Sequence, residues 1–244
     1  MSLILKCCFP LFAGLAFAVS SLNGAIVITE ILYNASGADG SQEWVEIYNS
    51  GSSTVDVTGW KLNDEDANAG DWGTLSGSLA PGEVGIITEV PETDFKSAWS
   101  TAATATIFSL GIGNWGNLAN GSPGSTNETL HIVDDLGNPV DWANYENPGG
   151  NSSTDWPDSA NGESIYVLAG FFDQTSNDDG SNWALSSVGT DGAVTSTATA
   201  NFEAGNIGSP GVVATAIPEA ETSGLFLGLV VSAGLLYRRR RTRA

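Results

Sequence analysis

The chain has 244 residues with 28 acidic and 8 basic side chains, which gives a formal charge of −20. Charged residues make up 15% of it while glycine contributes 30 residues, a composition that favours short strands joined by turns over coiled coils and helical bundles. Nucleic acid is excluded as a partner, because phosphate binding needs clustered basic residues and the sequence between the two termini has only Lys61 and Lys96.

The first residues have the pattern of a secretory signal. Lys6 precedes an uncharged, largely apolar run over residues 7–19, and small residues follow it. We therefore expect residues 1–24 to be a signal peptide; the alternative is a signal anchor that stays in place. Cys7 and Cys8 both lie inside this segment, so the mature protein would have no disulfide, thiolate metal site or cysteine nucleophile.

The body of the chain reads as short strands separated by turn-forming residues. Strands are predicted over residues 26–33, 42–49, 55–57, 60–63, 83–90, 129–133, 140–145 and 164–168. In the second strand Val45 and Ile47 lie on one face, and Trp44, Glu46 and Tyr48 lie on the other. Because both faces are apolar, this strand is predicted to be central in its sheet and covered on each side.

The connections complete the expected architecture. Residues 55–57 and 60–63 are expected to form a hairpin about Thr58 and Gly59, and residues 92–103 are the one plausible helix. Three segments are long for hairpin loops and are expected as insertions at the ends of the fold: residues 64–72, 103–125 and 147–159. Seven or more short strands with little helix predict an all-β sandwich.

The order of these pieces resembles the bacterial lamin-tail domain. The matching segments are residues 28–34, 43–49, 56–62, 79–83, 128–141, 162–165, 181–183 and 208–211. The resemblance spans residues 25–211 and implies an immunoglobulin-like β-sandwich that is secreted or attached to the bacterial surface. It also implies that Trp44, Trp60 and Trp183 pack inside the sandwich.

No catalytic constellation is found in the sequence. His131 is the only histidine and is expected on a strand surface, because no nucleophile motif accompanies it and zinc would need more histidine or cysteine ligands. Paired carboxylates could hydrolyse glycosides, but an acidic body always offers some pair at a suitable distance.

Two other kinds of site remain open. Calcium could bind the oxygen-rich loops, which contain Asn63, Asp64, Glu65, Asp66 and Asp71, and Asp173, Asn177, Asp178 and Asp179; ordinary solvated turns are the alternative. Trp72, Trp115 and Trp156 lie in polar, glycine-rich loops, where they could stack on sugar rings or plug the ends of the sandwich. No other cofactor is expected.

The C-terminal end has the pattern of a membrane tail. Residues 223–237 carry no charge, and Arg238, Arg239, Arg240 and Arg241 follow them. We expect residues 222–244 to form a transmembrane helix with its arginine-rich end in the cytoplasm, the alternative being an amphipathic surface helix. A helix over residues 223–237 would reach about 22 Å, which is short of the ~30 Å hydrocarbon core.

This tail is similar to the PEP-CTERM sorting signal. Pro218 and Glu219 lie in a linker over residues 212–221, and a short apolar segment and an arginine cluster follow. The usual motif is Pro-Glu-Pro, whereas Ala220 stands at its third position here. The resemblance implies processing by an exosortase in a Gram-negative bacterium that makes exopolysaccharide.

The expected function is a non-catalytic secreted surface or extracellular-matrix module. It would be exported, sorted through its C-terminal tail and either anchored in the membrane of the cell envelope or released to the matrix. Its expected partners are an exosortase-type enzyme, the membrane, and extracellular polysaccharide or envelope proteins. The alternatives are a carbohydrate-binding module and an acidic-residue hydrolase.

Overall fold

A computed structural model describes residues 26–37, 42–63, 73–114, 118, 128–146, 156–157, 159 and 161–215. These residues form a mostly β-sheet fold, as the strand pattern predicts. The largest sheet has six strands in the spatial order β11-β10-β1-β2-β6-β7. Their bounds are β1 Ile26–Leu32, β2 Trp44–Asn49, β6 Val84–Thr88, β7 Thr106–Ser109, β10 Ile165–Val167 and β11 Trp183–Leu185.

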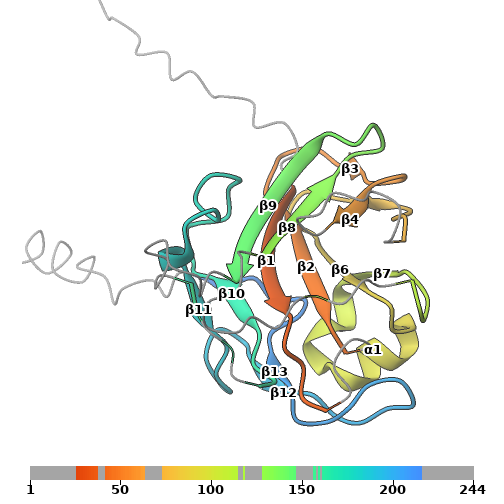
Figure 1. Ribbon diagram of the computed structural model, residues 1–244, viewed down its shortest axis with the longest axis vertical. Coiled ribbons are helices and arrows are strands. Elements are labelled where there is room, and N and C mark those ends of the chain that lie inside the picture. The colour runs from red at the N-terminus through yellow and green to blue at the C-terminus, as the bar shows by residue number, and fades with distance from the viewer. Residues whose placement is uncertain are drawn as a thin grey trace, which may run out of the picture.

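A three-stranded sheet lies against the face of β1 and β2 (Figure 1). Its spatial order is β4-β8-β9, with β4 at Lys61–Asn63, β8 at Glu128–Val133 and β9 at Pro139–Glu146. Two short ladders complete the strands: β3 Val55–Asp56 pairs with β5 Ser78–Leu79, and β12 Val194–Thr195 pairs with β13 Ile207–Gly208.

The expected hairpin about Thr58 and Gly59 is wrong. β3 pairs with β5, whereas β4 pairs with β8. The turn itself is present, since the N–H of Trp60 donates to the carbonyl of Val57 at 3.0 Å and Gly59 has φ +89°. It carries the chain from the β3–β5 ladder into the three-stranded sheet. Alternating side chains identify a strand, but they do not identify its partner.

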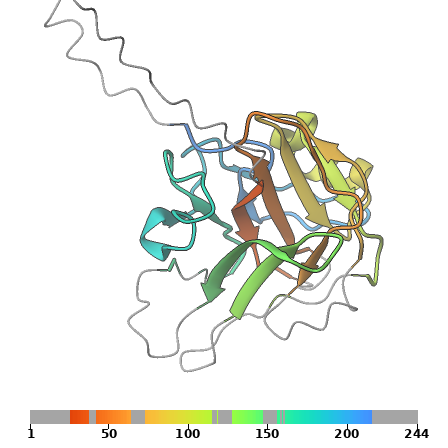
Figure 2. The same ribbon diagram turned by 90° about the horizontal axis from the view of Figure 1, so that it is seen from above.

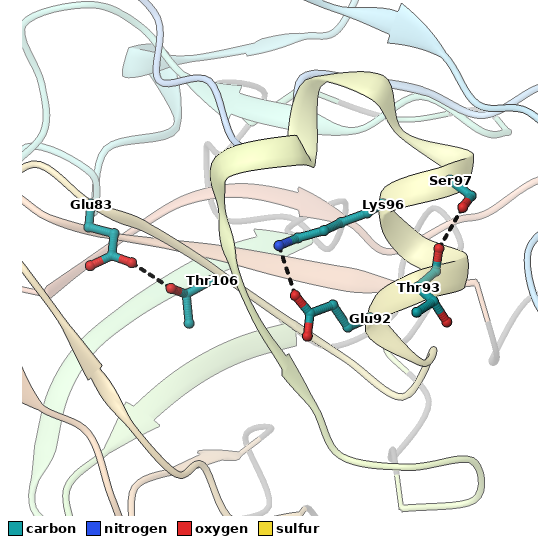
Figure 3. A network of polar contacts seen from close by, with 6 residues as sticks. All are labelled: Glu83, Glu92, Thr93, Lys96, Ser97 and Thr106. Atoms are coloured by element: carbon teal, nitrogen blue, oxygen red, sulfur yellow. Dashed lines mark hydrogen bonds and ion pairs between the residues drawn. The ribbon is translucent and has the colours of Figure 1, made fainter.

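The expected helix over residues 92–103 divides into two. The α-helix α1 covers Glu92–Ala98, and the 3₁₀ helix η2 covers Ser100–Thr104. Within α1, the ammonium group of Lys96 pairs with Glu92 at 2.8 Å and the hydroxyl of Ser97 donates to the carbonyl of Thr93 at 2.6 Å (Figure 3). A third short helix, η3, covers Gly180–Asn182.

Strand β7 lies inside the segment 103–125, which the sequence indicated as a loop insertion. It pairs parallel to β6 after the crossover through α1 and η2, and so becomes the edge of the six-stranded sheet. The hydroxyl of Thr106 at its start donates to the carboxylate of Glu83 at 2.5 Å (Figure 3). The second half of the expected insertion is largely outside the described residues.

The six-stranded sheet is covered on both faces, as Figure 2 shows in a view along the layers. Between the two sheets lies one hydrophobic cluster, which includes Val45 and Ile47 of β2. A second cluster lies between the other face and α1 and includes Trp44 of the same strand, with Tyr48 packed against it. The prediction of a central strand covered on each side is therefore confirmed, because β2 pairs with β1 on one side and β6 on the other.

The three tryptophans expected inside the sandwich have different surroundings. Trp44 is fully buried, but it packs edge-on against Phe95 and Trp99 under the helices. Trp183 is buried in the cluster between the sheets. Trp60 is only partly buried at the margin of that cluster, so its expected place in the core is corrected to the rim. It follows the turn at Gly59, where the chain passes between sheets.

Candidate functional site

Two carboxylic acids face each other in the middle of the six-stranded sheet. Glu30 of β1 and Glu46 of β2 are partners in the antiparallel register, and each side chain is 1% exposed. A register shift between Ile28 and Glu30 marks a bulge in β1. A bulge re-aims the side chains beyond it. Glu30 and Glu46, hereafter the carboxyl pair, therefore lie on the face that carries Trp44 rather than between the two sheets.

Glu30 is surrounded by hydroxyl groups from distant parts of the chain. Its Oε1 accepts hydrogen bonds from the hydroxyl of Ser164 at 2.5 Å and from the N–H of Ser209 at 2.8 Å. Its Oε2 accepts from the hydroxyl of Ser209 at 2.8 Å. The hydroxyl of Ser186 lies 2.7 Å from that of Ser164 and extends this network to β11.

Glu46 makes the corresponding contacts on its own side. The hydroxyl of Thr29 donates to Oε1 at 2.7 Å, and the main-chain N–H of Gly211 donates to Oε2 at 2.7 Å. Residues 207–211, hereafter the closing segment, are therefore fastened to the two central strands through both carboxyl groups. These contacts join residues that are 165 or more positions apart in sequence.

Two glycines allow the closing segment to lie this close to the sheet. A Cβ atom at Gly208 would lie 3.0 Å from Oε1 of Glu30 and also 3.0 Å from the ring of Trp44. Gly211 has φ +91°, and a Cβ there would lie 2.8 Å from the carbonyl oxygen of Thr101. In the motif over residues 208–211, Gly208 is therefore needed because its backbone lies so close to the sheet, and Gly211 is needed because its φ is positive.

Burial sets the protonation of the carboxyl pair. Removal from water raises the pKa of both groups above the ordinary carboxyl range, and the charge of Glu30 raises that of Glu46 further. The hydrogen bonds from Ser164, Ser209, Thr29 and Gly211 act in the opposite direction without cancelling it. A pair that is this deeply enclosed cannot reach a substrate in solution, so its chemistry is structural.

A third buried carboxyl group joins the two sheets. Asp141 of β9 accepts the N–H of Ile28 in β1 at 2.6 Å and the side-chain amide of Asn177 at 2.8 Å. Burial raises its pKa to about 7. The side-chain amide of Asn177 also donates to the main-chain carbonyl of Ile28 at 3.2 Å. The main-chain carbonyl of Asn177 accepts the indole N–H of Trp183 at 2.7 Å. Asp141 and Asn177 therefore connect β1 and β9 to each other and to the core residue Trp183.

A groove of about 440 Å³ lies beside the end of β6. Its described lining includes Glu89, Val90, Ile112 and the turn over residues 199–203, which ends at Glu203. The N–H of Gly113 donates to the carboxylate of Glu89 at 2.8 Å. These lining residues include no histidine, cysteine or basic side chain, so they do not supply the acid–base pair of a serine or cysteine hydrolase.

Residues 20–147 match the family model described as Lamin Tail Domain. The chain belongs to the lamin tail domain family. Lamin tail domains are immunoglobulin-like structural domains, and the family is not known as catalytic. No curated protein matches the chain.

The match ends before several strands of this lamin tail domain protein. Glu30, Glu46 and Asp141 lie inside residues 20–147, whereas Ser164 and the closing segment lie beyond them. The carboxyl pair thus joins the matched region to β10–β13. Sequence reasoning did not single out either glutamate. Their burial could have been predicted, because an acidic residue in a central strand that is covered on both faces is shielded from solvent.

The expected sugar-stacking tryptophans are only partly described. Trp72 and Trp115 lie outside the described residues. Trp156 is half-buried, and its ring lies against that of Trp183 with the ring centres 5.3 Å apart. A Cβ at Gly180 would lie 2.4 Å from the Trp156 ring, so the backbone there forms part of the surface on which this ring packs.

Of the two loops expected to bind calcium in this lamin tail domain, one is described and the other is largely outside the described residues. Within the described ranges, no three metal-binding side chains are gathered into one place. The loop at Asp173 is organised by its own hydrogen bonds, since its carboxylate accepts the N–H of Thr175 at 3.1 Å and of Ser176 at 3.0 Å. Asp179 caps η3 through the N–H of Ser181. In the other loop, Asn63 belongs to β4, and residues 64–66 and 71 are outside the described part.

His131 lies in β8, opposite Trp142 and Asn63 of the neighbouring strands. It is half-buried, and this burial lowers its pKa. The segment expected to be a signal peptide (residues 1–24), the expected sorting residues Pro218 and Glu219, and the expected transmembrane helix with its arginines (residues 222–244) all lie outside the described residues. Among the helices of the described ranges, none has the length and apolar character needed to cross a bilayer.

Proposed function

We propose that this protein is a non-catalytic display module, exported from the cell and held at the envelope through its C-terminal tail. The observation that carries this proposal is the carboxyl pair. It uses two acidic groups that could otherwise do chemistry to fasten the closing segment to β1 and β2. The structural character of the lamin tail domain family supports the same reading.

The place where the chain leaves the fold supports tethering from the C-terminus. The closing segment is held between β1, β2 and β12, and four described residues follow it, up to Thr215. A pull on residues beyond this point would be transmitted to the central sheet rather than to a peripheral strand. This is what a domain attached by its C-terminus requires.

The sorting steps come from the sequence. Residues 1–24 direct export, residues 223–237 hold the body at the membrane, and Arg238, Arg239, Arg240 and Arg241 face the cytoplasm. An exosortase-type enzyme then acts near Pro218 and Glu219. The mature protein is anchored at the envelope of a Gram-negative bacterium or released into its extracellular matrix.

The strongly acidic body sets what the module meets outside the cell. Between Ile26 and Ile217 there are 26 acidic residues and two lysines, a charge of −24. This charge keeps the module soluble and repels acidic polysaccharides and nucleic acids. Neutral polysaccharides and envelope proteins with basic surfaces are the compatible neighbours.

The retention step is tested by replacing the four arginines at 238–241 with glutamine. The unchanged protein should be recovered with the membrane or cut near Pro218, whereas the replaced protein should pass into the medium with an intact tail. A matched variant, in which Lys61 and Lys96 are replaced with glutamine, removes basic groups from the body and should sort normally. Identical membrane retention of all three proteins would refute the role of the arginine cluster.

The catalytic alternative is tested on the groove. Glu89 and Glu203 are the two acidic residues that line it, so an acidic-residue hydrolase acting there would depend on them. We expect the protein to release no reducing sugar from a panel of neutral and acidic polysaccharides. Hydrolysis that is lost in Glu203→Gln would overturn the non-catalytic proposal.

The carbohydrate-binding alternative is tested on Trp156, which lies outside the groove lining. Binding without hydrolysis that is lost in Trp156→Ala would make the module a carbohydrate-binding one.

A further inference from the structure

The closing segment is the cover of the carboxyl pair. Gly208 lies directly on the Glu30 carboxyl group, and Ser209 is buried and bonded to both of its oxygens. Gly211 reaches the carboxyl group of Glu46. If residues 207–211 moved away from the sheet, Glu30 and Glu46 would each lose the partners that these residues supply.

In the part of the chain that the structure describes, no basic side chain pairs with either of the two acids. Among the described residues, the basic side chains are Lys61 in β4 and Lys96, which pairs with Glu92 on α1. The titratable groups that face the pair are acidic or phenolic. Tyr166 of β10 stands opposite Glu30 and donates its hydroxyl to Asp191 at 2.7 Å.

The other elements around the pair present no charge to it. Opposite Glu46 in β6 stands Ile86, and the residue that follows β11, Ser186, contributes its hydroxyl. From η2, the backbone at Thr101 packs against Gly211. Ionisation of both glutamates would therefore place two negative charges side by side in a buried region where the described residues supply no counter-ion.

We propose that Glu30 and Glu46 form a protonation-controlled latch, which fastens the closing segment to the central sheet and releases it when both carboxyl groups ionise. A buried carboxyl group that loses its proton gains most from renewed contact with water. Moving the closing segment is the shortest route to that contact, because it is the layer lying on both groups.

The closing segment is held by few contacts other than those with the carboxyl pair. Apart from the carboxyl pair, its main chain is fixed by the bonds of Ile207 to Gly162 and Ser164 and by the short ladder with β12. By contrast, β1 and β2 pair along their length and are covered on both faces. Local opening begins where few contacts hold a segment, so this segment should open while the sheets stay folded.

Release of the closing segment would change the point at which the C-terminal tail leaves the fold. The chain beyond Thr215 would then start from a free segment rather than from a clamped one, which lengthens the reach between the fold and Pro218. This consequence depends on the proposed sorting function. The latch itself does not, because it concerns contacts inside the described fold.

Hydrogen exchange of the full-length protein in detergent tests the latch. Peptides covering residues 207–211 are compared at pH 5.5 and pH 8.5, after correction for the intrinsic exchange rate at each pH. We expect their protection to fall at least about tenfold at the higher pH, since each unit of pKa shift corresponds to a tenfold change in the equilibrium. Peptides from β1 and β2 should keep their protection at both values.

Two variants and a control assign the effect to the pair. Glu30→Gln and Glu46→Gln keep the shape and one acceptor oxygen, and the hydroxyls of Ser209 and Thr29 can turn to accept from the new amides. In the double variant the protection of residues 207–211 should differ less than about twofold between the two pH values. Glu92→Gln changes an exposed acid on α1 and should behave as the unchanged protein (Figure 3).

Several results would overturn the latch. One is equal protection of residues 207–211 at both pH values in the unchanged protein, a measurement that holds even if the variants fail to fold. Another is loss of protection in β1 and β2 in step with residues 207–211, which would be global unfolding. A third is a full pH response in the double variant. None of these results depends on where the cell places the protein, so failure of the sorting proposal is a separate outcome.

Discussion

The main-chain N–H of Ile28 donates a 2.6 Å hydrogen bond to the carboxyl group of Asp141, and so joins the six-stranded sheet to the three-stranded sheet. The bulge that follows Ile28 interrupts the ladder of β1 at this point. A polar side chain from the opposite sheet thereby takes up a donor that would otherwise be buried without a partner. Asn177 completes the arrangement by donating to both Asp141 and Ile28.

Asp141→Ala should destabilise the protein by about 2–4 kcal/mol, because it leaves the N–H of Ile28 and the amide of Asn177 without their acceptor. Urea denaturation at pH 5.5 measures the change. Asp135→Ala, at an exposed position in the turn between β8 and β9, serves as the control and should change stability by less than about 0.5 kcal/mol. Equal effects of the two substitutions would contradict the bridge between the sheets.

Stability should fall as the pH rises from about 5 to about 8. Burial raises the pKa of Asp141 and Glu30 to about 7 and that of Glu46 to about 8. The folded state therefore holds protons that the unfolded chain has already released, and this contribution is complete at acidic pH and lost as the pH passes the folded pKa values. We expect the free energy of unfolding to be several kcal/mol lower at pH 8.5 than at pH 5.5.

The double variant shows how much of this dependence comes from the carboxyl pair, since exposed acids of ordinary pKa are already ionised at pH 5.5. Glu30→Gln with Glu46→Gln should reduce the slope of stability against pH, while Asp56→Asn, at an exposed position, should leave it unchanged. A double variant with the slope of the unchanged protein would show that the carboxyl pair does not cause the dependence.

Trp44→Ala and Trp60→Ala should differ in their effects. Trp44 is fully buried among Phe95, Trp99 and the sheet, so its loss should cost about 3–5 kcal/mol. Trp60 is partly exposed at the rim of the core and should cost about 1–2 kcal/mol. Denaturation curves of the two variants check this order. A larger effect at Trp60 would place that ring in the core after all.

Ser209→Ala should destabilise the protein by about 1–2 kcal/mol, because the hydroxyl that donates to Oε2 of Glu30 is lost inside the fold. Ser187→Ala is the matched control, since Ser187 is exposed and should tolerate the change. Thermal denaturation at pH 5.5 compares them. If the two serines are equally tolerant, the closing segment is not held through its side chain.

Much of the fold could be predicted from the sequence, because strands show themselves through local alternation. The two-faced pattern of Val45 and Trp44 identified β2 as central, and the turn at Gly59 was placed correctly. The pairing of the strand before that turn was not, since partners are set by contacts between distant residues. The parallel strand β7 was missed because its segment lacks a regular alternation.

The candidate site was harder to foresee than the fold. Glu30 and Glu46 are 16 residues apart in sequence, and their partners Ser209 and Gly211 come from the other end of the domain. The motif over residues 208–211 was visible, but its physical reason appears only when Gly208 is seen lying on the Glu30 carboxyl group. Burial of Trp156 against Trp183 likewise depends on folding, because a polar loop sequence favours exposure.

The mass and location of the mature protein in its host test the central claim most directly. The account predicts a body outside the cytoplasm that lacks residues 1–24 and, where an exosortase is present, ends near Pro218 and Glu219. An uncut C-terminus in such a host would contradict the cleavage step alone and would point to Ala220 as the cause. Recovery of the full-length chain from the cytoplasm would contradict the proposed function as a whole.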